Sequence, residues 1–173
     1  MNRRWSLAPI IVAHAVWPGC GQKPAGRADA SDQSASCPLV GQYTLSSIAC
    51  GQADITAAWK QSVGESTLFI AQSTGSGCAV DQTNSGSTCA ETSRAVMTQI
   101  SGESWRSTDE GIATCTPAAC TFNSTDAPCA IGDRAGSYDL NVRLVDNTLT
   151  ISPNRPTALC AASPVVMTLT RRQ

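Results

Sequence analysis

The chain has 173 residues and a net charge of −1, with 12 Lys and Arg against 13 Asp and Glu. This near balance, without a basic stretch, excludes a nucleic-acid partner held by clustered positive charge. The only histidine, His14, lies near the N-terminus, so the rest of the chain has neither a histidine-dependent nucleophile nor a histidine metal site. Phosphate and dinucleotide loops are also missing, and no cofactor is expected.

The first 19 residues have the features of a signal peptide. Asn2–Arg4 give a positive start, and Trp5–Trp17 is a mostly apolar run of 13 residues. That run is too short to cross a hydrocarbon core of roughly 30 Å as a helix. A charged start followed by a short apolar centre is typical of a secretory signal. Residues 1–19 are therefore excluded from the folded protein.

Cys20 closes this segment, directly after Val16-Trp17-Pro18-Gly19. The segment resembles the lipobox of bacterial lipoproteins, in which a small residue, here Gly19, precedes a cysteine that is acylated and becomes residue one. The resemblance implies a membrane anchor at Cys20, and Gly21 in place of aspartate implies the outer membrane. Cleavage after Ala13-His14-Ala15 is the alternative, and it would release a soluble protein with an unpaired Cys20.

A polar segment separates Cys20 from the rest of the chain. Residues 21–36 contain no large apolar side chain, so they cannot bury enough surface to offset the entropy lost on ordering. We expect residues 20–36 to be the acylated cysteine and a flexible tether, whose 16 residues span roughly 20–24 Å. Residues 37–173 then form one domain of ordinary size.

This domain is predicted to be all-β, because Gly, Asn and Ser break the chain at short intervals and no segment has a convincing 3.6-residue apolar period. We expect an antiparallel β-barrel or sandwich of about 7–9 strands, stapled by disulfides. The polar segments Asp81–Gly86 and 103–110 are interpreted as surface loops. Strands are predicted, in chain order, at residues 39–48, 54–60, 67–71, 94–100, 138–144, 148–152 and 164–171.

Two of these strands have clear face assignments. The first places Tyr43, Leu45 and Ser47 on one face. The strand at 138–144 alternates apolar and polar residues, and Asp146-Asn147 supplies the two-residue turn of a hairpin, because both residue types tolerate positive φ.

A second resemblance concerns the ends of the domain. Val40-Gly41-Gln42-Tyr43-Thr44-Leu45 resembles the Gly-x-Trp opening of lipocalin-like barrels, with Tyr43 in place of the tryptophan. Such barrels often end with an arginine that packs over this ring, a position that Arg171 matches. The resemblance implies a Tyr43–Arg171 pair at the strand ends and an apolar ligand inside the barrel.

The eight cysteines after Cys20 are expected to form disulfides, because exported cysteines oxidise and no Cys-x-x-Cys metal motif occurs. Connectivity stays open, since it cannot be read from a sequence. Short loops favour Cys115 with Cys120 and Cys78 with Cys89, and pairing of the first and last strands would bring Cys50 to Cys160. The eight are Cys37, Cys50, Cys78, Cys89, Cys115, Cys120, Cys129 and Cys160.

Three hypotheses of function follow. The first is a non-enzymatic lipoprotein that binds a ligand, with Trp59, Trp105 and Arg106 as candidate ligand-binding residues. The second is a structural or protein-interaction component of the cell envelope. The third is a small hydrolase that uses two carboxylates. Its candidate residues, near Trp105, are Glu103, Asp109 and Glu110.

Overall fold

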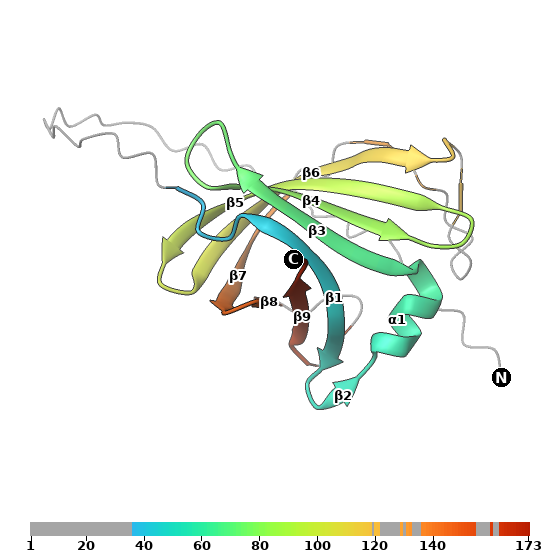
Figure 1. Ribbon diagram of the computed structural model, residues 1–173, viewed down its shortest axis with the longest axis horizontal. Helices are drawn as coiled ribbons and strands as arrows, with labels where there is room; N and C mark the ends of the chain where they lie inside the picture. Colours follow the sequence, from blue (N-terminus) through green and yellow to red (C-terminus); the bar gives the residue numbers. More distant parts are fainter. Residues whose placement is uncertain are drawn as a thin grey trace, which may run out of the picture.

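The computed structural model describes residues 36–118, 120–121, 129, 131–132, 136–154, 160 and 163–173. Within these residues, nine strands and one short helix are present, and no helix is long and apolar enough to cross a membrane. In chain order (Figure 1) they are β1 (Gly41–Cys50), β2 (Ala53–Asp54), α1 (Thr56–Val63), β3 (Glu65–Gln72), β4 (Cys78–Ser85), β5 (Ala90–Ser101), β6 (Ser104–Thr116), β7 (Gly136–Val145), β8 (Thr148–Pro153) and β9 (Val165–Arg171).

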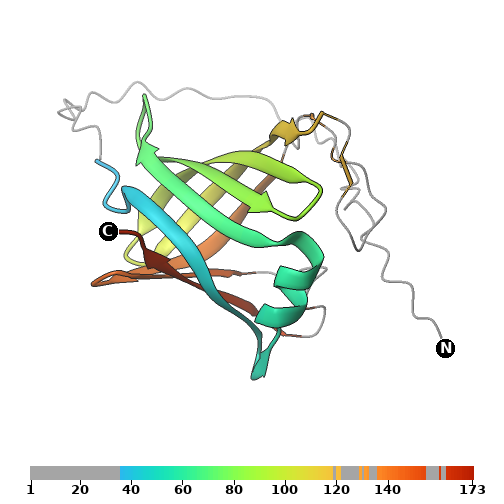
Figure 2. The same cartoon turned by 45° about the vertical axis from the view of Figure 1, so that its right-hand side comes forward.

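The strand directions give the molecule two distinct ends. At one end β1 begins, β9 finishes, and the connections β3–β4, β5–β6 and β7–β8 turn back. We call this the hairpin end; it lies on the left in Figure 2. The opposite end carries α1 and the β4–β5 connection, and we call it the helix end.

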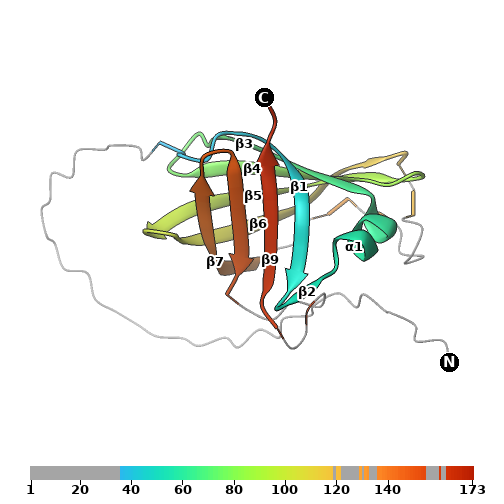
Figure 3. The ribbon, with the colours of Figure 1, turned by 60° about the horizontal axis from the view of Figure 1, so that its bottom comes forward.

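The sheet closes on itself. Its strand order is β2-β1-β3-β4-β5-β6-β7-β8-β9, and β9 also pairs with β1, from Tyr43↔Arg171 to Cys50↔Val165. Figure 3 shows β7, β8, β9 and β1 side by side in this closing wall. The ring is irregular, because β3 pairs with only the first four residues of β1 and β7 covers only the first half of β6. The predicted antiparallel all-β fold with disulfides is thus confirmed, in the form of an irregular barrel.

Side chains fill the inside of this barrel. Tyr43, Ile70 and Leu149 are fully buried, and Trp105 is 2 % exposed. They belong to one continuous core of eighteen buried residues, to which every strand of the ring contributes. A ring of eight strands encloses a space that side chains can fill or that can hold one small ligand, and here buried side chains from all eight strands pack together in it. The alternating apolar residues of β1, β7, β8 and β9 pack in this interior.

The face assignment of β1 differs from the prediction at one residue. A β-bulge against β9 lies between Leu45 and Ser47 and inserts one extra residue into β1. As a result Ile48, which is 1 % exposed, joins Tyr43 and Leu45 in the core, and Ser47 does not. Strict alternation cannot foresee such a shift.

Three predicted segments are wrong in type. The strand predicted at 54–60 is mostly helix α1. The loop predicted at Asp81–Gly86 is largely strand β4, and the loop predicted at 103–110 is largely strand β6. The helix begins where Asp54 accepts hydrogen bonds from the backbone N–H and the hydroxyl of Thr56. The Thr56 N–H belongs to the first turn of the helix, where it has no acceptor within the helix, and Asp54 supplies one. The two bonds also hold the pKa of Asp54 below its usual value.

The eight described cysteines form four disulfides: Cys37–Cys78, Cys50–Cys160, Cys89–Cys120 and Cys115–Cys129. The Cys50–Cys160 bond is the one predicted from closure of the barrel. The predicted Cys78–Cys89 and Cys115–Cys120 bonds are wrong. Residues 78–85 form an extended strand, which separates Cys78 from Cys89 by the length of β4. Short sequence spacing is therefore a poor guide where the intervening residues are extended.

A row of seven threonines crosses the outer face of the barrel. Successive strand pairings place each threonine directly opposite the next, and Thr83 and Thr92 share a hydrogen bond between their hydroxyl oxygens, which are 2.9 Å apart. Threonine suits such positions because β-branched side chains pack well on a pleated surface. The row consists of Thr148, Thr170, Thr44, Thr67, Thr83, Thr92 and Thr114.

Candidate functional site

The three predicted ligand-binding residues do not form one site. Trp105 points into the core, between Gln99 of β5 and Leu140 of β7 in the strand register. Arg106, the next residue, points outward and forms an ion pair with Asp139, with Nε 2.9 Å from Oδ1 and Nη2 3.4 Å from Oδ2. Neighbouring residues of a strand face opposite sides of a sheet. Trp105 therefore packs, and Arg106 is available only to the outer surface.

The Arg106–Asp139 pair changes the proton affinity of both groups. The hydrogen bond from Arg106 holds the pKa of Asp139 below its usual value, and the same bond raises the pKa of Arg106. The pair lies beside an open depression on the outer surface, which Ser137, Tyr138 and Asn154 also line. Both side chains are exposed to solvent, so the pair contributes little to stability.

Trp59 begins a chain of polar contacts that leads into the barrel. It lies on α1, and its indole N–H donates to Ser66 Oγ at 2.9 Å. The Ser66 hydroxyl donates to Asn84 Oδ1 at 2.7 Å, and the Asn84 amide donates to Glu91 Oε1 at 3.1 Å. Ser66 and Asn84 are buried, and each has its partners within this chain. The contacts fix α1 against β3 and β4, which is a structural role for Trp59.

Among the three candidate carboxylates, Glu103 lies far from Asp109 and from the adjacent Glu110. Glu103 lies in the β5–β6 turn at the hairpin end, and its ion pair with Arg143 measures 3.6 Å. Asp109 is six residues further along, where it accepts the N–H of Gly111 at 2.9 Å. At about 3.3 Å per residue, six residues of strand separate Glu103 from Asp109 by about 20 Å. Glycoside hydrolysis needs carboxyl groups roughly 5–9.5 Å apart, so Glu103 and Asp109 do not provide this arrangement.

The pair of Tyr43 and Arg171 lies where the first and last strands of the barrel meet. The guanidinium carbon of Arg171 lies 5.4 Å from the centre of the Tyr43 ring. Arg171 Nη2 donates to Tyr43 Oη at 3.1 Å and to the Val40 carbonyl at 2.5 Å, and the Tyr43 hydroxyl donates to the Leu39 carbonyl at 2.9 Å. Gly41 leaves room for this contact, since a Cβ there would lie 2.8 Å from Arg171 Nε.

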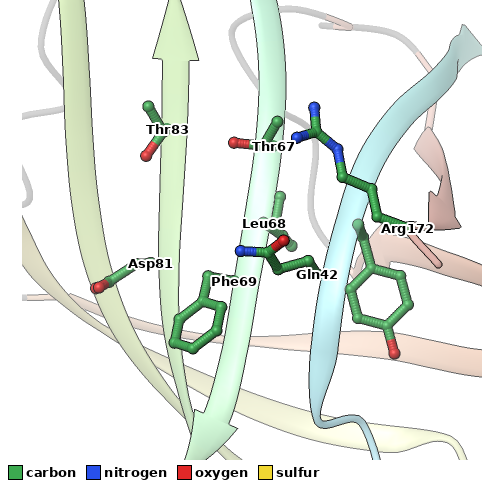
Figure 4. A pocket seen from close by; sticks show the side chains of 8 residues that line it. Gln42, Thr67, Leu68, Phe69, Asp81, Thr83 and Arg172 are labelled. Carbon is green, nitrogen blue, oxygen red and sulfur yellow. The ribbon is translucent and has the colours of Figure 1, made fainter.

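Strands β1, β3 and β4 present a small hollow on the outer face of the barrel, above the Tyr43–Arg171 pair. Its volume is about 60 Å³, far below the roughly 300–1,000 Å³ of pockets for drug-sized ligands. Phe69 is 49 % exposed at its centre. In Figure 4 its ring lies between Asp81 and Gln42, while Arg172 reaches toward Thr67. The outward side chains of this outer-face hollow are Gln42, Thr67, Phe69, Asp81, Thr83 and Arg172.

The outer-face hollow has a polar rim with fixed charges. Arg172 Nε donates to Thr44 Oγ1 at 2.7 Å, and Asp81 accepts from Arg94 Nε at 3.0 Å. An aromatic ring with planar polar neighbours offers a partner one apolar contact together with directional hydrogen bonds. Sequence reasoning does not find the hollow, because it predicts a loop at Asp81–Gly86 and so does not align Asp81 and Thr83 with Phe69.

Two disulfides pack against each other near the helix end. The sulfur atoms of Cys89, Cys120 and Cys129 all lie within 4.8 Å of one another, although Cys129 is bonded to Cys115. A metal is bound by thiolates, and disulfide sulfurs do not provide them. This cluster is therefore a second, sulfur-rich core, which also holds Ile112.

The expected acylation site, Cys20, and the expected tether up to residue 35 lie outside the described residues. Comparison of the chain with protein-family models, with curated proteins and with solved structures finds no match in any of the three.

Proposed function

We propose that the protein is an exported lipoprotein, anchored in the outer membrane by acylation of Cys20, whose domain binds a protein partner through its outer surface and has no enzymatic activity. The observation that carries this proposal is the packed interior, in which eighteen buried residues form one core. A lipocalin-like domain that stores an apolar molecule needs empty space inside its barrel. With that space occupied by side chains, recognition falls to the outside.

The four disulfides support an exported protein. Disulfides form and persist in the periplasm and at cell surfaces and are rare in the cytosol. All eight cysteines of the domain form disulfides with one another, so none of them is available as a disulfide partner for Cys20. Cys20 is therefore the cysteine that remains for a lipid, as the lipobox resemblance implies.

The anchor is tested by intact mass and membrane flotation of the wild type and of Cys20→Ala. We expect a wild-type mass that exceeds the chain from Cys20 by fatty acyl groups, and a variant that leaves the membrane fraction. A wild-type chain that starts at Val16 without a lipid would overturn the anchor.

The packed interior is tested with a fluorescent fatty acid, titrated into the soluble Cys20→Ala protein. We expect no saturable binding. Leu149→Ala in the same background is the control that shows whether an opened core binds a ligand: removal of this buried side chain costs about 2–5 kcal/mol in stability and should create a cavity that binds benzene but is too small for the fatty acid. Saturable one-to-one binding of the fatty acid to the parent protein would contradict the packed interior and favour the lipocalin-like hypothesis, in which the barrel holds an apolar ligand.

The outer surface is tested by a photo-crosslinking amino acid at position 69 in living cells, with position 131, at an exposed isoleucine outside the hollow, as the matched control. We expect a defined adduct with one envelope protein from position 69 only. The adduct should weaken in Arg172→Glu, which reverses the charge at the rim of the outer-face hollow. Equal adducts from both positions, or none, would contradict recognition at this face.

A further inference from the structure

Exposed aliphatic side chains concentrate at the hairpin end. The described surface has five large hydrophobic residues that are clearly exposed, and three of them lie at this end: Val40 at 48 %, Ile100 at 53 % and Val145 at 47 %. Val40 directly precedes β1, Ile100 precedes the β5–β6 turn, and Val145 precedes the β7–β8 turn. These three residues, which we call the aliphatic rim, therefore lie at separate points around the ring of strands.

The domain is joined to the preceding chain at this same end. Cys37 is bonded to Cys78 at the start of β4, and its N–H donates to the Gln72 side chain at 2.6 Å. Both partners lie at the β3–β4 turn, which belongs to the hairpin end. The point at which the tether leaves the domain is thus fixed covalently beside the aliphatic rim.

The lengths involved favour one orientation on a membrane. The 16 residues after Cys20 span roughly 20–24 Å when flexible. β5, with 12 residues, is about 40 Å long, which corresponds to about 30 Å between the two ends because the strands of a barrel are tilted. Facing the helix end toward the bilayer would require the tether to stretch past the whole barrel. The hairpin end, in contrast, lies within the ordinary reach of the tether.

Charges do not oppose close approach of the hairpin end to lipid. Glu103 and Arg143 form an ion pair there, and Asp146 in the β7–β8 turn is balanced by Arg172 beyond β9. Three aliphatic side chains alone bind a bilayer weakly. A tether raises their effective concentration at the surface, so a weak contact is sufficient to orient the domain.

We propose that the hairpin end is a membrane-contacting surface, in which Val40, Ile100 and Val145 insert shallowly into the lipid bilayer beside the tether. This inference rests on the proposed anchor at Cys20. It assigns an orientation to the anchored protein: the helix end points away from the membrane, and the outer-face hollow lies on the side wall.

The test places a tryptophan at either end of the acylated full-length protein, reconstituted in vesicles of phosphatidylethanolamine and phosphatidylglycerol with brominated acyl chains. Val145→Trp probes the aliphatic rim. Ile131→Trp is the matched control, because the neighbouring Gly132 pairs with Ile112 in the half of β6 toward the helix end. The unsubstituted protein supplies the background of Trp59 and Trp105. We expect the emission of Val145→Trp to shift to shorter wavelength and to be quenched, and that of Ile131→Trp to stay unchanged.

Two failures are distinguishable. A wild-type protein without an acyl chain in its intact mass, and without flotation, overturns the anchor and the orientation together. An acylated protein that floats, but in which both tryptophans are quenched equally or not at all, overturns the orientation alone. If Val145→Trp does not give the parent circular dichroism spectrum, Ile100→Trp replaces it with the same expected result.

Discussion

At the scale of single residues, the guanidinium of Arg171 joins the last strand of the barrel to the start of the first. It bonds Tyr43 Oη and the Val40 carbonyl and lies over the Tyr43 ring. We predict that Arg171→Gln lowers the free energy of unfolding by about 1–3 kcal/mol, because two hydrogen bonds and a cation–π contact are lost. Arg172→Gln, the neighbouring exposed arginine, should change it by less than about 0.5 kcal/mol. Urea unfolding of both variants measures the difference, and equal losses would contradict the role of Arg171.

The carboxyl group of Asp139 provides a test by titration. Its pKa lies below the usual value because Arg106 donates to the charged form. A lowered folded-state pKa stabilises the fold above the unfolded pKa, near 3.9, and this stabilisation is lost as the pH falls through the folded value. Arg106→Gln should raise the pKa of Asp139 toward that ordinary value in a carboxyl NMR titration. Arg94→Gln, which removes the ion pair with Asp81, is the control and should leave the pKa of Asp139 unchanged.

Residues at the strand ends were easier to anticipate than residues in the middle of the sheet. The resemblance of the two ends of the domain to lipocalin-like barrels implied the Tyr43–Arg171 pair, and the spacing of apolar residues indicated the two strands that carry it. The burial of Trp105 depends on β6 being a strand, and its neighbours Ser104 and Arg106 gave no sign of one. The outer-face hollow forms only where β1, β3 and β4 pair in one particular register, and a local sequence pattern does not show how distant strands pair.

At the scale of elements, the threonine row contributes to the pairing of β4 with β5. Thr83 and Thr92 are directly opposite, with a hydrogen bond between their hydroxyl groups. A double-mutant cycle with Thr83→Val and Thr92→Val should give a coupling energy of about 0.2–1 kcal/mol. Thr148 and Thr170, directly opposite on β8 and β9, form the control pair; no hydrogen bond joins their side chains in the described structure, so their coupling should be smaller. A larger coupling for the control pair would contradict this account.

The two strands that the sequence failed to indicate, β4 and β6, share one physical cause: their inward faces are partly polar. On β4 the inward Asn84 accepts from Ser66, and on β6 the inward Ser107 is 2 % exposed. Register shifts between β5 and β6 further disturb the alternation. Helix α1 is short and has no fully buried residue, so its apolar period is too weak to recognise. The strands with regular alternation, β7, β8 and β9, were predicted correctly.

At the scale of the whole molecule, the disulfides differ in the length of chain that they close. Cys50–Cys160 spans 110 residues and Cys115–Cys129 spans 14. Chain entropy gives about 4.7 kcal/mol for a loop near 100 residues and about 3 kcal/mol for one near 15. We predict that Cys50→Ala with Cys160→Ala destabilises the protein more than Cys115→Ala with Cys129→Ala, by about 1–2 kcal/mol.

The disulfide prediction is measured by urea unfolding, after peptide mapping has shown that the other three bonds remain in each variant. Equal losses would indicate that local packing of the sulfur-rich core outweighs loop length. The wider lesson is that the sequence leaves barrel and sandwich open, and that Cys50–Cys160 follows only on the condition that the first and last strands pair, as they do. The remaining bonds depend on strand lengths that the sequence did not reveal.

The bond between Cys37 and Cys78 has a mechanical consequence. A pull on the residues before Cys37 reaches the β3–β4 hairpin through a covalent bond, and it does not first peel β1 from its neighbours. Cys50–Cys160 holds the far end of β1 to the connection between β8 and β9. Strand β1, which would carry the load of an anchored domain, is thus clamped at both ends, so a pull on the preceding residues should not draw β1 out of the sheet until one of these two disulfides has been reduced.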